Sequence, residues 1–110
     1  MTVNETKLKG CFIIEPKVFF DDRGLFFESF QKEKLEKAMG IPLNFVQDNQ
    51  SISKQGVLRG LHFQERAHAQ SKLVQVVKGD ILDVIVDLRE ESPTFGEYIK
   101  IKLSDSTKKS

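Results

Sequence analysis

The sequence has very little of three things: cysteine, net charge and long apolar runs. Cys11 is the only cysteine in 110 residues, which excludes a disulfide framework and a multi-cysteine zinc site and favours a reducing compartment. Lys and Arg total 17 against 16 Asp and Glu, so no overall field favours nucleic acid or an anionic membrane. No apolar run reaches membrane-spanning length, and the start MTVNETKLKG lacks the core of a signal peptide. These deficits predict a cytoplasmic protein with no nucleic-acid or membrane partner.

Short apolar runs separated by turn residues make up most of the chain, whose length predicts a single domain over residues 1–110. Residues 21–24 and 78–80 predict tight turns. Residues 31–39 predict a helix that ends at Gly40. Strands are expected at residues 11–14, 17–20, 25–30, 45–51, 57–64, 73–77, 81–88 and 98–103. Many short strands and one helix favour an all-β sandwich or barrel over a doubly wound α/β fold.

The residue patterns of the last two predicted strands indicate which of their faces should be buried. Lysines alternate with apolar residues in 98–103, so the apolar side chains there should point inward. One face of strand 81–88 is wholly apolar and consists of Leu82, Val84, Val86 and Leu88. The other face carries Ile81, Asp83, Ile85 and Asp87. Both faces of this strand are therefore expected to be at least partly covered.

Residues 56–73 concentrate the ionisable side chains that could carry chemistry. This stretch holds both histidines, His62 and His68, together with Arg59 and Lys72, in segments that otherwise resemble buried strands. Ionisable groups are costly to bury unless they are paired or used, so these residues are the first candidates for a site. A satisfied core histidine, with the basic residues on a solvated rim, explains the spacing equally well.

Arg59 and His62 can share one site only if strand 57–64 is irregular, because strict alternation puts them on opposite faces. Gly60 lies between them, and a glycine inside a strand often marks a bulge, so we expect a bulge or twist at Gly60. Like charge from Arg59 and Lys72 would favour a neutral imidazole, the form that a general base needs. Two cations would suit a diphosphate or a developing enolate. The cluster therefore points to proton abstraction from a phosphate-bearing substrate.

Other kinds of site find less support in the sequence. Residues 47–50 are three amides and a carboxylate, which could bind a polar ligand but equally suit a strand that runs out into a loop. His62 and His68 are six residues apart, and neighbouring cations would oppose a metal ion. Cys11 sits in an apolar run and is expected to be a small core residue rather than a nucleophile.

Five blocks of the sequence resemble the dTDP-4-dehydrorhamnose 3,5-epimerase family in order and in spacing. They are EPKVFFDDRGLFFESF (15–30), FVQDNQS (45–51), GVLRGLHFQ (56–64), KLVQVVKGDILDVIVDLR (72–89) and SPTFGEY (92–98). The resemblance implies an all-β, cupin-like jelly roll and a homodimer with exchanged strands, without a metal or other cofactor. It also implies an isomerase that converts dTDP-4-dehydro-6-deoxy-D-glucose to dTDP-4-dehydro-L-rhamnose, in dTDP-rhamnose and surface polysaccharide biosynthesis.

The resemblance also assigns roles to individual residues. The 4-keto group acidifies the protons at C3 and C5, and His62 resembles the base that removes them. Lys72 resembles the cation beside the enolate oxygen, and Asp83 could support the site from a neighbouring strand. The positions that match the family's substrate-binding residues, some of which act across the dimer interface, are Arg23, Glu28, Gln47, Asp48, Asn49 and Arg59.

The chain departs from the family pattern in its length. Family members continue past the position of Ser110 into further strands, which carry a second histidine, the tyrosine proposed as general acid and the aspartate that orients the base. The only tyrosine here, Tyr98, does not match the position of that acid. The resemblance therefore implies a partial jelly roll that is incomplete at its carboxyl end, either a fragment or a natural short form. Two alternatives stay open: a dTDP-sugar 3,4-ketoisomerase, and a catalytically silent module that binds nucleotide sugar or self-associates.

Overall fold

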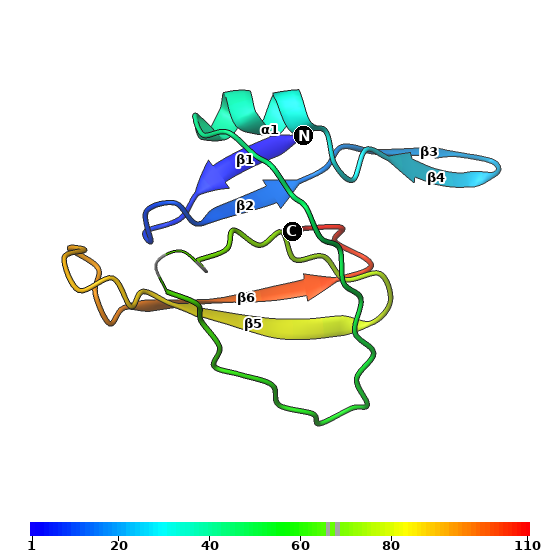
Figure 1. The fold of residues 1–110 in the computed structure, drawn as a ribbon. Helices are drawn as coiled ribbons and strands as arrows, with labels where there is room; N and C mark the ends of the chain where they lie inside the picture. Colours follow the sequence, from blue (N-terminus) through cyan, green and yellow to red (C-terminus); the bar gives the residue numbers. More distant parts are fainter. Residues whose placement is uncertain (66, 68) are drawn as a thin grey trace. The chain divides into compact units, whose positions relative to one another are not determined.

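The computed structural model describes residues 1–65, 67 and 69–110, and its backbone forms two compact units (Figure 1). The first unit combines Met1–Leu43 with Val74–Ser110, and the second is Asn44–Leu73. The elements of the first unit are β1 (Thr2–Glu5), β2 (Phe12–Glu15), β3 (Val18–Asp21), β4 (Gly24–Phe27), α1 (Lys32–Met39), β5 (Asp80–Val86) and β6 (Tyr98–Ser104). Among the described residues, no helix is long and apolar enough to cross a membrane.

The six strands pair as three antiparallel two-stranded sheets, β1–β2, β3–β4 and β5–β6. The turn between β3 and β4 forms as predicted: the backbone N–H of Arg23 donates to Asp21 Oδ1 at 2.9 Å, and Gly24 adopts a φ of 135°. Glycine accepts that φ because it has no Cβ. The aromatic segment predicted as a strand over 25–30 leaves the ladder earlier, at Phe27.

The helix predicted over residues 31–39 is confirmed as α1 (Figure 1). Gln31 caps its amino end, where the side-chain oxygen accepts a 2.6 Å hydrogen bond from the N–H of Lys34. Gly40 ends the helix in the left-handed conformation, with its N–H bonded to the carbonyl of Glu36. The helix packs on β1 and buries Leu35, which is 1% exposed.

The β5–β6 sheet is covered on one side only. In β6 the inward apolar and outward lysine pattern is confirmed, and Leu103 is 2% exposed. In β5 the prediction of cover on both faces is wrong, because Leu82 is 65% exposed and Val84 is 36% exposed. The opposite face is better covered, and Asp83 and Ile85 are half-buried. On the Leu82 face, only Val86 is half-buried.

Three predicted strands, over residues 45–51, 57–64 and 73–77, are wrong, and the described residues contain six strands rather than the eight predicted. The hairpin predicted at 78–80 is also wrong, because β5 pairs with β6 rather than with 73–77. A strand exists only beside a hydrogen-bonded neighbour, and these segments have none among the described residues. Their sequences have strand character, but no described residue forms a ladder with them.

We expect Leu35→Ala to lower the free energy of unfolding by about 2–4 kcal/mol, because it deletes one of the few fully buried side chains and leaves a cavity between α1 and β1. Urea denaturation followed by circular dichroism measures the effect. The matched control is Lys37→Ala on the exposed side of the same helix, which should change stability by less than about 0.5 kcal/mol. Equal effects of the two substitutions would contradict this account of the core.

Candidate functional site

The second unit, Asn44–Leu73, carries six of the eight predicted site residues, and its described residues form no α-helix or β-strand. All six side chains are exposed: Gln47, Asp48, Asn49, Arg59, His62 and Lys72. The expectation that the cluster lies within buried strands is therefore wrong, because the sheet neighbours that would bury it are absent from the described residues. His68, predicted to be a loop or rim residue, lies outside the described residues.

Arg59 is held by its own loop. Its Nε donates to Ser53 Oγ at 3.0 Å, and its Nη2 approaches the carbonyl oxygen of Ile52 at 3.5 Å. A guanidinium has five N–H donors in a fixed fork, so these contacts leave most of the fork for another acceptor. An arginine that is fixed in this way and still exposed is suited to bind a phosphate or carboxylate.

His62 and Lys72 form no hydrogen bond or ion pair within the described part of the chain. The Gly60 φ of 125° shows that the backbone departs from strand geometry between Arg59 and His62. The predicted bulge itself is not observed, because this segment has no ladder that a bulge could interrupt. The structure thus presents the proposed base and cation as open side chains, without a contact that joins either of them to Arg59.

The amide cluster is partly organised. Gln47 Nε2 donates to Asn49 Oδ1 at 3.2 Å, so these two side chains lie close together. Asp48 lies between them and is exposed. The segment is a loop rather than a strand, so the alternative left open by its sequence is the one observed.

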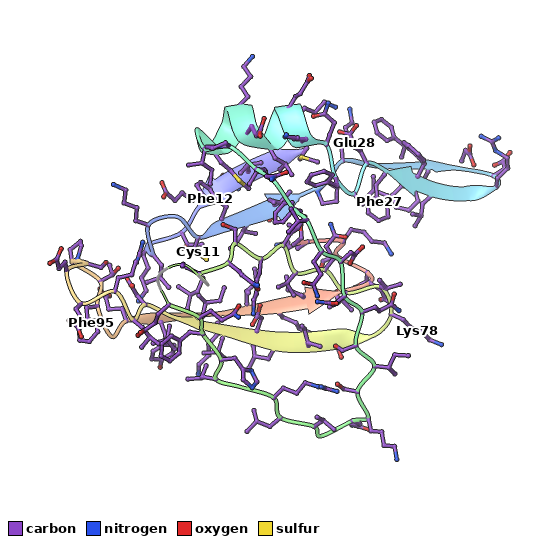
Figure 2. All side chains as sticks on the ribbon, viewed as in Figure 1. Cys11, Phe12, Phe27, Glu28, Lys78 and Phe95 are labelled. Atoms are coloured by element: carbon purple, nitrogen blue, oxygen red, sulfur yellow. The ribbon has the colours of Figure 1, made fainter. Side chains whose placement is uncertain are left out.

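The other two predicted site residues, Arg23 and Glu28, belong to the first unit and have local partners. Arg23 donates to Asp21 Oδ2 from Nε at 3.1 Å and from Nη2 at 2.6 Å. These hydrogen bonds lower the pKa of Asp21. Glu28 Oε1 accepts from Lys34 Nζ at 2.8 Å, which ties the end of β4 to α1 (Figure 2).

The β3–β4 hairpin also forms a shallow hollow of about 310 Å³ that sequence reasoning missed. It is lined by Phe19, Phe20, Asp21, Arg23, Gly24, Leu25 and Phe26. Phe20 is 77% exposed and Phe26 is 69% exposed, and Arg23 brings a cation to the same surface. Exposed rings beside a guanidinium suit a flat, anionic ligand. The signal in the sequence is the aromatic density of residues 19–30, which β propensity alone also explains.

A buried carboxylate, Asp87, is the centre of a second feature that the sequence did not reveal. Asp87 is 4% exposed and accepts from Arg89 Nε at 2.8 Å and Nη2 at 2.9 Å. Its Oδ2 also accepts from Ser92 Oγ and Thr94 Oγ1, both at 2.6 Å. An aspartate followed by Arg at the second position and by Ser-Pro-Thr at the fifth to seventh is the pattern that could have indicated it.

The Asp87 network closes the loop between β5 and β6. Besides the side-chain bonds, Gly96 N–H donates to the Asp87 carbonyl at 2.7 Å, and Asp87 N–H donates to the Glu97 carbonyl at 2.9 Å. The hydrogen bond from Arg89, followed by those from Ser92 and Thr94, holds the pKa of Asp87 far below its usual range. Asp87 therefore stays ionised over the physiological pH range, and its role is to hold the loop rather than to transfer protons.

Comparison with known proteins gives consistent matches. A family model described as dTDP-4-dehydrorhamnose 3,5-epimerase matches residues 5–110. A curated protein of that name from Salmonella typhimurium is 50% identical over 109 residues, which cover 99% of this chain and 60% of the relative. The crystal structure of a protein of that name from Elizabethkingia anophelis superimposes with a TM-score of 0.93 at 50% identity and covers 99% of this chain and 60% of that one.

A third match is a 3,5-epimerase from Legionella pneumophila, solved in complex with dTDP-4-keto-L-rhamnose. It gives a TM-score of 0.91 at 47% identity and covers 98% of this chain and 57% of that one. With six strands and one short helix, these likenesses confirm the predicted all-β, cupin-like jelly roll. The chain spans about 60% of the length of the relatives that it matches.

We expect Asp87→Asn to lower the Tm by on the order of 5 °C near neutral pH, because the amide loses the ion pair with Arg89 and part of its acceptor capacity. The native state depresses the pKa of Asp87, so this stabilisation is complete above the unfolded pKa of about 4 and is lost as the pH falls below it. The difference between wild type and variant, followed by thermal unfolding from pH 7 to pH 2, should therefore narrow in acid. The control is Asp80→Asn at the start of β5, whose ion pair with Lys102 is exposed and should contribute little. A difference that grows in acid would contradict the account.

Proposed function

The chain belongs to the dTDP-4-dehydrorhamnose 3,5-epimerase family, and from this premise we propose that it forms the base-bearing half of such an epimerase. The proposed substrate is dTDP-4-dehydro-6-deoxy-D-glucose, and the proposed product of the complete enzyme is dTDP-4-dehydro-L-rhamnose. One observation carries the proposal: the family match over residues 5–110 contains every residue to which we give a role. The cytoplasmic location expected from the single cysteine stays a prediction.

The proposed reaction needs one base and one electrostatic partner for each proton that is removed. The keto group at C4 acidifies the C–H bonds at C3 and C5. His62 takes the proton, and the electron pair of the broken C–H bond moves into an enolate whose negative charge lies on the C4 oxygen. Lys72 stabilises that oxygen through its ammonium group. Return of a proton to the opposite face inverts the carbon and requires an acid that we do not assign to any residue of this chain.

We propose that the substrate is bound by the residues that match the family's binding positions. Arg59, held by Ser53 with most of its guanidinium free, is suited to the diphosphate or the sugar. Gln47, Asp48 and Asn49 offer amide and carboxylate groups for the hydroxyls of the nucleotide sugar. Arg23 and Glu28 contribute from the first unit. The hollow beside Arg23, with its exposed rings, suits a flat base next to phosphate.

We further propose that the protein forms a homodimer in which strands are exchanged. Support comes from the β3–β4 hairpin, which pairs only with itself among the described strands and extends away from β2 and α1 (Figure 1). Phe20 and Phe26 are mostly exposed on this hairpin. Exposed aromatic side chains of this size usually mark an interaction surface. Exchange would bring Arg23 and Glu28 of one chain to the site of the other.

A second candidate function is a silent module that binds nucleotide sugar without turnover. The observation that favours it is the place of the only tyrosine. Tyr98 begins β6 and pairs with Val86 in the β5–β6 ladder, which leaves it a sheet residue rather than a candidate for the family's acid. In this alternative the binding residues act as proposed, and His62 removes no proton.

Incubation with dTDP-4-dehydro-6-deoxy-D-glucose in deuterated water should introduce deuterium at C3 and C5, detected by NMR, without net inversion. Exchange needs only the base, whereas inversion needs the acid as well. His62→Ala should slow exchange about 10²–10⁴-fold, and the matched control His68→Ala should retain it. Binding of the sugar nucleotide without exchange in the wild-type chain would overturn the epimerase proposal in favour of the silent module.

Two lysine substitutions test the proposed electrostatic role of Lys72 in the same deuterium-exchange measurement. Lys72→Ala should slow exchange by about 10²-fold or more, because the enolate loses its stabilising cation. Lys54→Ala removes a lysine of equal charge from the same unit, also exposed, and should leave exchange unchanged. Equal effects of the two substitutions would show that only the general positive charge of the unit matters.

A further inference from the structure

Glu28 lies in the short segment that joins the β3–β4 hairpin to helix α1. β4 ends at Phe27, and Gln31 caps the amino end of the helix. Among the described strands, β3 and β4 pair only with each other, so residues 28–31 form one of the two covalent connections between this hairpin and the rest of the first unit. Figure 2 labels Glu28 beside the start of α1. The conformation of this segment therefore decides where the Glu28 carboxylate points.

Lys34, in the first turn of α1, holds the side chain of Glu28. Its Nζ donates to Glu28 Oε1 at 2.8 Å. Its backbone N–H donates to the Gln31 side chain at 2.6 Å, which fixes the turn from which the lysine extends. Glu28 Oε2 accepts no hydrogen bond within the part of the chain that the structure describes. One carboxylate oxygen is thus held, and the other is available to a ligand.

Gln75 holds the backbone of the same segment from a distant part of the sequence. Its Nε2 donates to the carbonyl oxygen of Ser29 at 2.9 Å, across 46 positions of the chain. Both residues belong to the first unit. Because Ser29 directly follows Glu28, this bond restrains the backbone next to the carboxylate-bearing residue. Lys34 and Gln75 therefore restrain Glu28 at two levels, the side chain and the backbone.

We propose that Lys34 and Gln75 are positioning residues that orient Glu28 for the nucleotide sugar without touching the ligand themselves. A glutamate that is free before binding loses conformational entropy when the ligand fixes it, and a side chain that is already held avoids part of this cost. An exposed ion pair contributes little to stability, so the effect concerns ligand affinity rather than folding. The inference rests on the proposed function for one point, the role of Glu28 in binding.

Isothermal titration calorimetry with dTDP-D-glucose, which has a nucleotide-sugar framework but no reactive keto group, tests the proposal. Lys34→Ala and Gln75→Ala should each weaken binding about three- to tenfold, because a side chain must then be ordered when the ligand binds. Lys34→Arg keeps the cation and should bind within about twofold of the wild-type chain. The control Lys37→Ala removes an equal charge from the last turn of the same helix and should leave affinity unchanged.

A double-mutant cycle separates positioning from a general loss of charge or stability. In the Glu28→Ala background, Lys34→Ala and Gln75→Ala should have no further effect on affinity, because both residues act through Glu28. Further weakening in that background, or wild-type affinity in both single variants, would overturn the proposal. Wild-type binding that Glu28→Ala does not weaken would overturn it as well.

The ligand-free chain offers a measurement that does not depend on the proposed function. Three-bond NMR couplings of the Glu28 side chain should show one χ1 rotamer in the wild-type chain and in Lys37→Ala, and rotamer averaging in Lys34→Ala. Averaged couplings in the wild-type chain would overturn the inference. A single rotamer together with no binding of dTDP-D-glucose would contradict the proposed function instead, and the anchoring of Glu28 by Lys34 would stand.

Discussion

The backbone of a β-strand is satisfied only by a neighbouring strand, and this requirement explains most of the structure. Every strand in the part of the chain that the structure describes has one full partner, so each sheet there is two strands wide and exposes an edge. Isolated two-stranded sheets are marginally stable in water. The core is correspondingly small, with five buried apolar side chains among the described residues: Leu8, Ile14, Leu35, Leu43 and Leu103. Ile14 of β2 also exchanges two backbone hydrogen bonds with Ser110.

The loop around Asp87 and the segment that carries Arg59 and His62 differ in how their polar groups are satisfied. Asp87 closes its loop with side-chain and backbone hydrogen bonds that come from within ten residues, so it needs no further strand. The segment that carries Arg59 and His62 has the sequence of a strand but no ladder, and its polar groups stay exposed. The proposed base, His62, has no hydrogen bond among the described residues that would fix its orientation for catalysis. Arg59, by contrast, is held by its hydrogen bond to Ser53.

Local signals in the sequence predicted the local structure well. Gly40 ends the helix, Asp21 and Gly24 make the first hairpin turn, and lysines alternate with apolar residues in β6. The family resemblance predicted the fold class. What failed was non-local: apolar alternation at 57–64 and 73–77 predicts a strand but not whether a neighbour is present, and the apolar face of Leu82 does not reveal whether a layer covers it. The Asp87 network was missed because its members looked like ordinary turn residues until the fold placed them around one carboxylate.

The central claim is that this chain carries the residues proposed to bind the nucleotide sugar of a 3,5-epimerase. Titration of the ¹⁵N-labelled chain with dTDP, followed by the backbone amide signals in NMR, tests it most directly. The account predicts saturable shifts in residues 23–28, 47–49 and 59–62, with weaker binding in Arg59→Ala. Shifts confined to β5 and β6, or no saturable shift at all, would contradict it.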